Sequence, residues 1–256
     1  MSRVFAIAVN TARESIRNKV LYSVMFFAAL LIGIASAFGA VSLGDSIKFV
    51  KDFALTGLSL FGVAATVVLG VTMVHNELQR RTIYNVLSKP VSRGEFLLGK
   101  YLGLMATLLA MVTGMAFAVF VVLGALEGAP DWNLVPAILM MLAEIAILAA
   151  VAVFFSTVVV TPALAGLFTV AAFIAGRSAS WLAHFRGDEF PAALRAVAAV
   201  LQRVLPQLDQ LYVADRLIAG QTLPASLYAW AVAYALCYVA VLLAASLVLF
   251  RRREFV

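Results

Sequence analysis

The stretch ELQRRTIYNVLSKPVSRGEFLLGK, residues 77–100, lies between two long apolar runs and decides how this chain is organised. The flanking runs, 53–75 and 96–124, are each long enough to cross a bilayer, which takes about 20 residues of helix. The stretch carries five basic residues and two acidic ones, and a short basic loop between spans normally faces the cytoplasm. Its spacing predicts an amphipathic helix over about 79–89, ended by Pro90. Such a helix at the inner ends of two spans suits docking to a soluble partner.

The composition places the chain in a membrane. Its 256 residues are 64% hydrophobic, with a mean hydropathy of +1.03, too apolar for a soluble domain of this size. The apolar runs show no alternation, which excludes a β-barrel and predicts helices. The one cysteine, Cys237, lies in an apolar run, so neither a disulfide nor a thiol metal cluster is expected. The basic residues are sorted by membrane side rather than clustered, which argues against nucleic-acid binding.

These runs predict an all-α integral membrane protein with six transmembrane helices in one domain over residues 1–256. The spans are expected at about 20–43, 53–75, 96–124, 134–158, 162–182 and 225–250. Residues 2–18 have apolar and charged side chains on opposite faces, which predicts an interfacial helix lying along the membrane. The alternative is a signal peptide cleaved after Ala37, although its apolar core is longer than is usual for one.

The distribution of Lys and Arg predicts the orientation. With the N-terminus inside, the inner segments hold twelve of these residues and the outer segments seven, so both termini are expected in the cytoplasm. The longest loop, 183–224, then lies outside. Its apolar spacing and its prolines predict short outer helices over about 190–219, between spans five and six. Simple packing on the span ends and a gating role are both open for them.

Two glycine patterns lie on the predicted spans. Residues 94–100 have the spacing GxxxxGK, but Tyr101 follows where a phosphate-binding loop needs a hydroxyl for Mg²⁺, and no β-strand precedes it. Gly99 and Gly103 are therefore interpreted as a close-packing site. A second set of small residues allows close helix contact within the subunit or with a second copy: Gly62, Thr66 and Gly70.

Glu144 is the acidic residue that lies well inside a predicted span. An unpaired carboxylate there costs several kcal/mol, so an intramembrane acid is a candidate functional residue. It either pairs with Arg177 of the next span, reaches a wetted groove or contacts a substrate. His75 and His184 lie near opposite faces without ligand partners at a suitable spacing, so no metal site is expected. No catalytic signature is present.

Several stretches resemble the six-span permease subunits of type-2 ABC exporters. Arg13-Glu14 and the run from Arg17 to Tyr22 look like the family's N-terminal elbow helix. Phe155-Ser156-Thr157 and Arg252-Arg253-Glu254-Phe255 also fit. The residues that resemble the region around the family's ATPase-docking coupling helix are Glu77, Arg80, Arg81, Thr82, Ile83, Val86, Leu87, Ser88, Lys89 and Pro90. Within the family, the chain is most similar to the subgroup of the nitrous oxide reductase maturation permease.

The resemblance implies a non-catalytic permease of the bacterial inner membrane. It would pair with a second permease, identical or related, and with two copies of a cytoplasmic ABC ATPase that hold ATP and Mg²⁺, so this chain needs no cofactor. Two alternatives stay open. An ABC-type subunit could transmit force or a signal to a periplasmic protein without transport, and a channel or carrier would need no ATPase. An ATPase gene beside this one would count against the channel.

Overall fold

The computed structural model describes residues 3–17, 22, 25–26, 29–30, 33–34, 46–79, 92–129, 131–159, 161–185, 191–218, 220–221 and 223–252. These residues form nine α-helices and two short 3-10 helices, and no strand occurs among them. Four of the described helical segments are long and apolar enough to cross a membrane: Ile47–Met73, Arg93–Glu127, Trp132–Val158 and Ala225–Phe250. The described part of the chain is therefore the all-helical, multi-pass membrane fold that the apolar runs predict.

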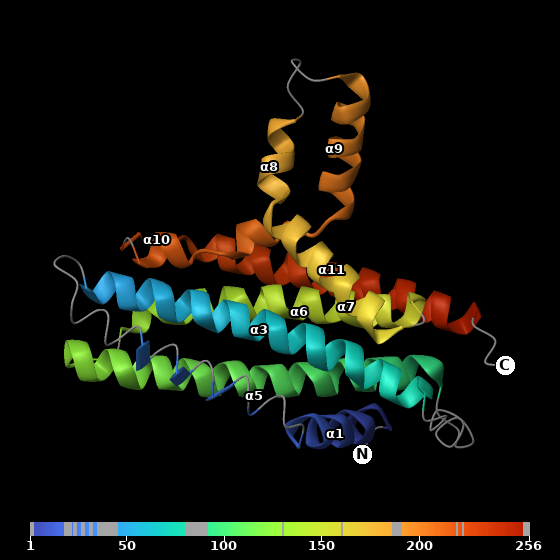
Figure 1. The fold of residues 1–256 in the computed structure, drawn as a ribbon, viewed down its shortest axis with the longest axis horizontal. Helices are drawn as coiled ribbons and strands as arrows, with labels where there is room; N and C mark the ends of the chain where they lie inside the picture. The colour runs from blue at the N-terminus through green and yellow to red at the C-terminus, as the bar shows by residue number, and fades with distance from the viewer. Residues whose placement is uncertain are drawn as a thin grey trace.

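The long helices run lengthwise beside one another (Figure 1). They are α3 (Ser46–Gln79), α5 (Arg93–Glu127), α6 (Val135–Val158) and α11 (Ala225–Arg252). Helix α6 is the central one, because it contacts the other three and also α7. Its residues are mostly apolar around the whole helix, as expected for a helix enclosed by others, with Glu144 as the charged exception. Its residues Ile145 and Leu148 are buried against the rest of the core.

Capping residues set both ends of α5, and a 3-10 helix leads from there into α6. Helix α5 begins with a capping box, in which the Ser92 hydroxyl accepts from the Glu95 amide and the Glu95 carboxylate accepts from the Ser92 amide. It ends at Gly128, which has a φ of 79° and so adopts the left-handed conformation that favours glycine. The 3-10 helix η1 (Trp132–Leu134) then leads directly into α6. The connection between α5 and α6 is therefore short.

The segment predicted as the fifth span, 162–182, is divided in the structure. Helix α7 (Pro162–Arg177) has 16 residues, and after Ser178 the chain continues as α8 (Ala179–His184) in another direction. Figure 1 shows α8 and α9 (Ala192–Val204) projecting from the side of the bundle as a pair. The turn coincides with Gly176, where a Cβ would lie 2.6 Å from the Pro206 carbonyl oxygen. Packing of the later segment against this glycine marks the end of α7, which the hydropathy does not reveal.

Four other predictions compare with the structure as follows. The outer helices expected over 190–219 correspond to α9, η2 (Leu208–Leu211) and α10 (Ala214–Ile218). Helix α3 begins at Ser46, ahead of the expected start at 53. Most of the predicted first span, 20–43, and all but the first residue of the predicted helix 79–89 lie outside the described residues.

Candidate functional site

The predicted docking region lies between two rigid helices. Helix α3 is continuous to Gln79 and α5 begins at Arg93, so the backbone on both sides of the loop is helical or close to a helix end. Glu77 belongs to the end of α3. The other predicted docking residues lie outside the described part of the chain: Arg80, Arg81, Thr82, Ile83, Val86, Leu87, Ser88, Lys89 and Pro90.

The N-terminal helix α1 (Arg3–Ile16) packs against the start of α5. The close approach needs both predicted glycines of α5. A Cβ on Gly99 would lie 2.7 Å from the Ile7 Cβ, and one on Gly103 would lie 2.6 Å from the Ala8 carbonyl oxygen. The hydroxyl residues Thr11 and Ser15 are the buried residues of α1. Helix α1 thus packs on the two glycines of α5 through Ile7, Ala8 and Thr11, a face that the apolar pattern of residues 2–18 does not fully indicate.

The small residues of α3 face α6 within the same chain. A Cβ on Gly62 would lie 2.8 Å from the Ile145 Cδ1, and one on Gly70 would lie 2.8 Å from the Ala152 Cβ. Thr66, between them, is fully buried and donates a hydrogen bond of 2.7 Å to the Gly62 carbonyl. These contacts within the subunit account for the small-residue pattern of the helix.

Helices α5 and α11 are tied together at the end of the bundle where α5 begins and α11 ends. The Arg93 guanidinium donates a hydrogen bond of 2.8 Å to the Phe250 carbonyl. The Phe96 and Phe250 rings stack with their centroids 6.4 Å apart. Because a basic group near the C-terminus of a helix is favourable, Arg93 stabilises the end of α11. The start of α5 thus contacts both α1 and α11 beside the predicted docking loop.

Glu144 and Arg177 come together as an ion pair. Glu144 is fully buried on α6, and its Oε1 lies 2.9 Å from an Nη1 of Arg177 at the end of α7. The Arg177 guanidinium also lies over the Tyr212 ring, 3.9 Å from its centroid. The Tyr212 hydroxyl is 3.2 Å from the Thr56 hydroxyl on α3. One polar chain thus connects α6, α7, the segment after η2 and α3.

The second carboxylate oxygen of Glu144, Oε2, is buried and has no hydrogen-bond partner among the described residues. A buried carboxylate is stabilised when its oxygens are all satisfied. Arg177 therefore supplies most of the compensation for this charge. Sequence reasoning missed Tyr212 and Thr56 because neither is charged and the two lie 156 residues apart.

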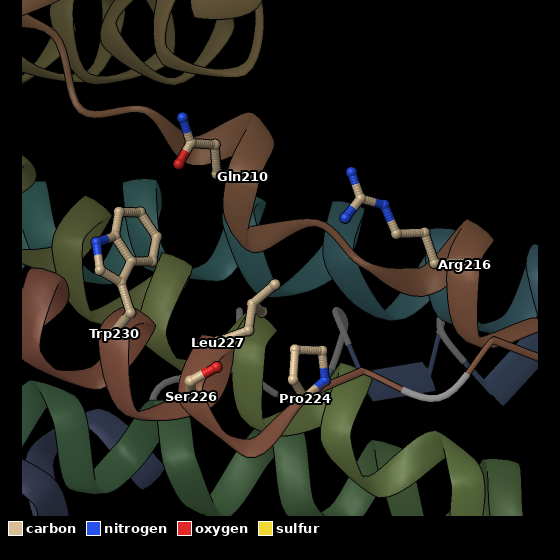
Figure 2. Close-up of a pocket in the computed structure, with 6 residues that line it drawn as sticks. All are labelled: Gln210, Arg216, Pro224, Ser226, Leu227 and Trp230. Atoms are coloured by element: carbon tan, nitrogen blue, oxygen red, sulfur yellow. The ribbon is translucent and has the colours of Figure 1, made fainter.

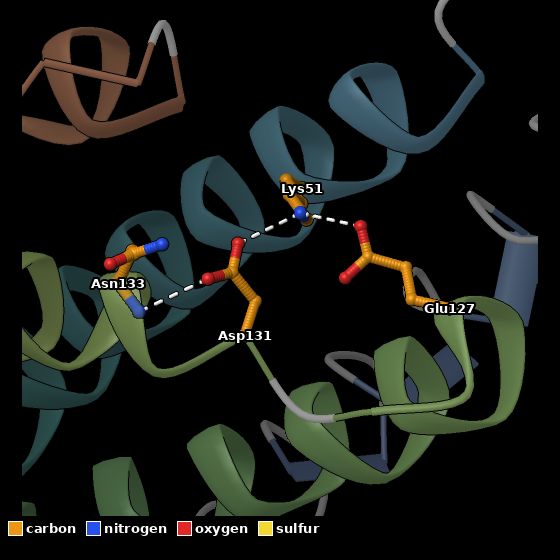
Figure 3. Close-up of polar contacts among 4 residues, drawn as sticks. All are labelled: Lys51, Glu127, Asp131 and Asn133. Carbon is orange, nitrogen blue, oxygen red and sulfur yellow. Dashed lines mark hydrogen bonds and ion pairs between the residues drawn. The ribbon is translucent and has the colours of Figure 1, made fainter.

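A second ion network lies where α5 ends and α6 begins, at the end of the bundle away from the Arg93–Phe250 contact. The Lys51 ammonium lies 2.6 Å from the Glu127 Oε1 and 2.8 Å from the Asp131 Oδ2 (Figure 3). The backbone N–H of Asn133 donates a hydrogen bond to the Asp131 Oδ1. Burial raises the pKa of Asp131, but the hydrogen bonds from Lys51 and Asn133 outweigh it and hold that pKa below its usual value. This network joins α3 to the α5–α6 connection.

The structure also bears on the sites that the sequence argues against. Residues 94–100 belong to α5, so most of their amides make helical hydrogen bonds and do not form a phosphate-binding cradle. Among the described residues, no group of three or more His, Cys, Asp or Glu side chains could hold a metal ion.

The chain matches the family described as ABC-2 family transporter protein over residues 5–255, nearly its whole length. It therefore belongs to this family of membrane transport proteins. A search of curated proteins found no match. Members of the family are generally non-catalytic transport components that work with an ABC ATPase.

Proposed function

We propose that this chain is the permease subunit of an ABC exporter, docked to a separate cytoplasmic ATPase through residues 77–90. The observation that carries the proposal is the course of α3. The apolar run in its sequence ends at Val74, but the helix continues to Gln79, which takes it about 7.5 Å farther. A helix that leaves the apolar zone and leads into a basic loop offers a rigid contact for a soluble partner.

The packing at this end of the bundle supports transmission of movement from the loop. Helix α5 follows the loop directly and is held by α1 through Gly99 and Gly103 and by α11 through Arg93. Close-packed elements move together rather than deforming. A displacement of the loop by ATP-driven closure of the ATPases would therefore move α1, α5 and the end of α11 as a unit.

The further parts of the proposal rest on the sequence and its resemblance. They are a homodimer of permeases with two ATPase copies, six spans with α1 as an elbow helix, and both termini in the cytoplasm of a bacterial cell. ATP and Mg²⁺ would bind the ATPase, with no cofactor in this chain. Membership of the nitrous oxide reductase maturation subgroup stays a prediction of the sequence, and the docking proposal does not depend on it.

Reversal of the loop charges tests the docking. The double variant Arg80→Glu with Arg81→Glu should lose co-purification of the partner ABC ATPase and still insert into the membrane. The matched control reverses two arginines of α9, Arg195→Glu with Arg203→Glu, and should retain the ATPase. Normal ATPase binding by the loop variant would remove the assignment of residues 77–90 as the docking element.

A further inference from the structure

A cavity of about 650 Å³ lies where α11 begins, between the start of this helix and the segments η2 and α10. Figure 2 shows Gln210 and Arg216 on one wall and the first turns of α11 on the other. The residues lining the cavity are Gln210, Arg216, Pro224, Ser226, Leu227 and Trp230. One guanidinium, an amide, a hydroxyl and an indole therefore surround a space that is large enough for a small ligand.

Internal contacts hold both walls of the cavity in place. The Trp230 ring stacks on Tyr234 with centroids 5.1 Å apart, and the Gln207 amide donates to the Tyr234 hydroxyl at 2.9 Å. Gln207 in turn accepts from the Gln210 side chain at 2.6 Å. Because this chain of contacts crosses from α11 to η2, the two walls are joined on one side of the cavity and the space is preformed.

Arg216 is presented to the cavity by the packing of α10. Its neighbour Leu217 is buried, as is Ala214, and they fix the opposite side of the short helix. The Arg216 side chain itself is exposed and makes no ion pair with any residue that the structure describes. An unpaired guanidinium beside a hydroxyl and an amide favours an anion with several oxygen acceptors, such as a phosphate ester.

An apolar stripe leads away from the cavity along α11. Trp230, Cys237, Val241 and Val248 are spaced for one face of a helix, and all four are exposed. Val241 is 69% exposed and Val248 52%. Exposed apolar residues on a helix long and apolar enough to span a membrane face lipid chains. The cavity lies at the end of this stripe, where a lipid headgroup would lie relative to its chains.

We propose that the cavity binds the phosphate headgroup of an anionic phospholipid. Arg216, Ser226 and Gln210 contact the phosphate and glycerol oxygens, and Trp230 packs against the headgroup–chain junction, as tryptophan does at membrane interfaces. The acyl chains follow the α11 stripe. Headgroup and chains are thus bound by adjoining surfaces of one helix.

Quenching of Trp230 by brominated lipids tests the proposal directly. The chain has three tryptophans, so the Trp132→Phe, Trp181→Phe background leaves Trp230 as the reporter. The protein is reconstituted in vesicles of phosphatidylcholine that contain either brominated phosphatidylglycerol or brominated phosphatidylcholine. Brominated phosphatidylglycerol should quench Trp230 to the same extent as brominated phosphatidylcholine at about fivefold lower mole fraction. This preference corresponds to about 1 kcal/mol, the contribution of one basic contact.

The variants separate the headgroup site from general lipid contact. Arg216→Gln should make the two brominated lipids quench at nearly equal mole fractions. Arg216→Lys should retain most of the preference for phosphatidylglycerol, and the control Arg203→Gln on α9 should leave that preference unchanged. Equal quenching by both lipids in the unaltered reporter protein, or an unchanged preference in Arg216→Gln, would overturn the proposal. Equal quenching by both lipids, together with a change in Trp230 emission on adding inorganic phosphate, would assign the cavity to a soluble anion and also overturn it.

Discussion

The pair of Glu144 and Arg177 gives the sharpest prediction for the stability of the bundle. Replacing Arg177 with Ala leaves a fully buried carboxylate without its ion-pair partner. At about 4 Å between charge centres and an effective dielectric constant of about 20, the attraction lost is about 4 kcal/mol. The Arg177→Ala variant should therefore be destabilised by about 3–5 kcal/mol, the range for a broken buried pair.

Glu144→Gln is expected to cost less. The Arg177 side chain keeps about a quarter of its surface exposed and still lies over the Tyr212 ring, so its charge remains solvated and partly stabilised. The loss should be about 1–2 kcal/mol. Adding Glu144→Gln to Arg177→Ala removes the stranded charge and should restore part of the stability.

Equilibrium unfolding in mixed detergent micelles measures this cycle, with Arg203→Ala as a control for loss of one arginine. A direct pair requires a coupling energy of at least about 1.5 kcal/mol, well above the 0.3–0.5 kcal/mol error of additivity. Additive single and double variants would refute the conclusion that Arg177 compensates the buried charge. Tyr212→Phe retains the ring beneath Arg177, so it should cost no more than about 1 kcal/mol.

Two further predictions concern packing and pH. Gly103→Ala places a methyl group 2.6 Å from the Ala8 carbonyl oxygen and should destabilise the protein by about 1–3 kcal/mol. The control Gly166→Ala has its nearest contact at 3.9 Å and should be neutral or stabilising. Equal melting temperatures for the two variants would contradict the packing of α1 on α5. Asp131→Asn should lower stability by about 1 kcal/mol near neutral pH. The pKa of Asp131 is lower in the folded protein than in the unfolded chain, where it is about 3.9. The ionised carboxylate therefore contributes its full stabilisation of the fold above the unfolded pKa, and this stabilisation is lost as the pH falls through the folded pKa. The difference between the melting temperatures of the two proteins should therefore shrink below about pH 4, and a difference that grows in acid would contradict the assignment.

The elements that lipid dictates could be predicted from the sequence. An apolar run in a bilayer must be helical because its backbone groups have no other partners, so α3, α5, α6 and α11 follow from composition. Helix α3 begins ahead of the apolar run that predicts the span at 53–75, and the reason is an ion pair. Lys51 ends the apolar run, but in the structure it pairs with Glu127 and Asp131, and the helix continues past it to Ser46.

The features that depend on tertiary contact could not be predicted. The division after α7 coincides with packing of Pro206 on Gly176, and nothing in the local hydropathy reports it. Thr11 and Ser15 count as polar residues in any pattern of α1, although they form its buried face. Glu144 and Arg177 were identifiable because charges inside apolar runs are conspicuous, while Tyr212, which lies against Arg177, was not.

Cross-linking from single cysteines tests the proposed docking most directly. Cys237→Ser removes the one native cysteine, and a new cysteine is placed at Ile83 in the loop or, as a control, at the exposed Ala196 on α9. A short thiol-to-amine cross-linker should join the Ile83 variant to the ABC ATPase and leave the Ala196 variant unjoined. Cross-linking of the ATPase from Ala196, or none from Ile83 in a complex that still co-purifies, would contradict docking through residues 77–90.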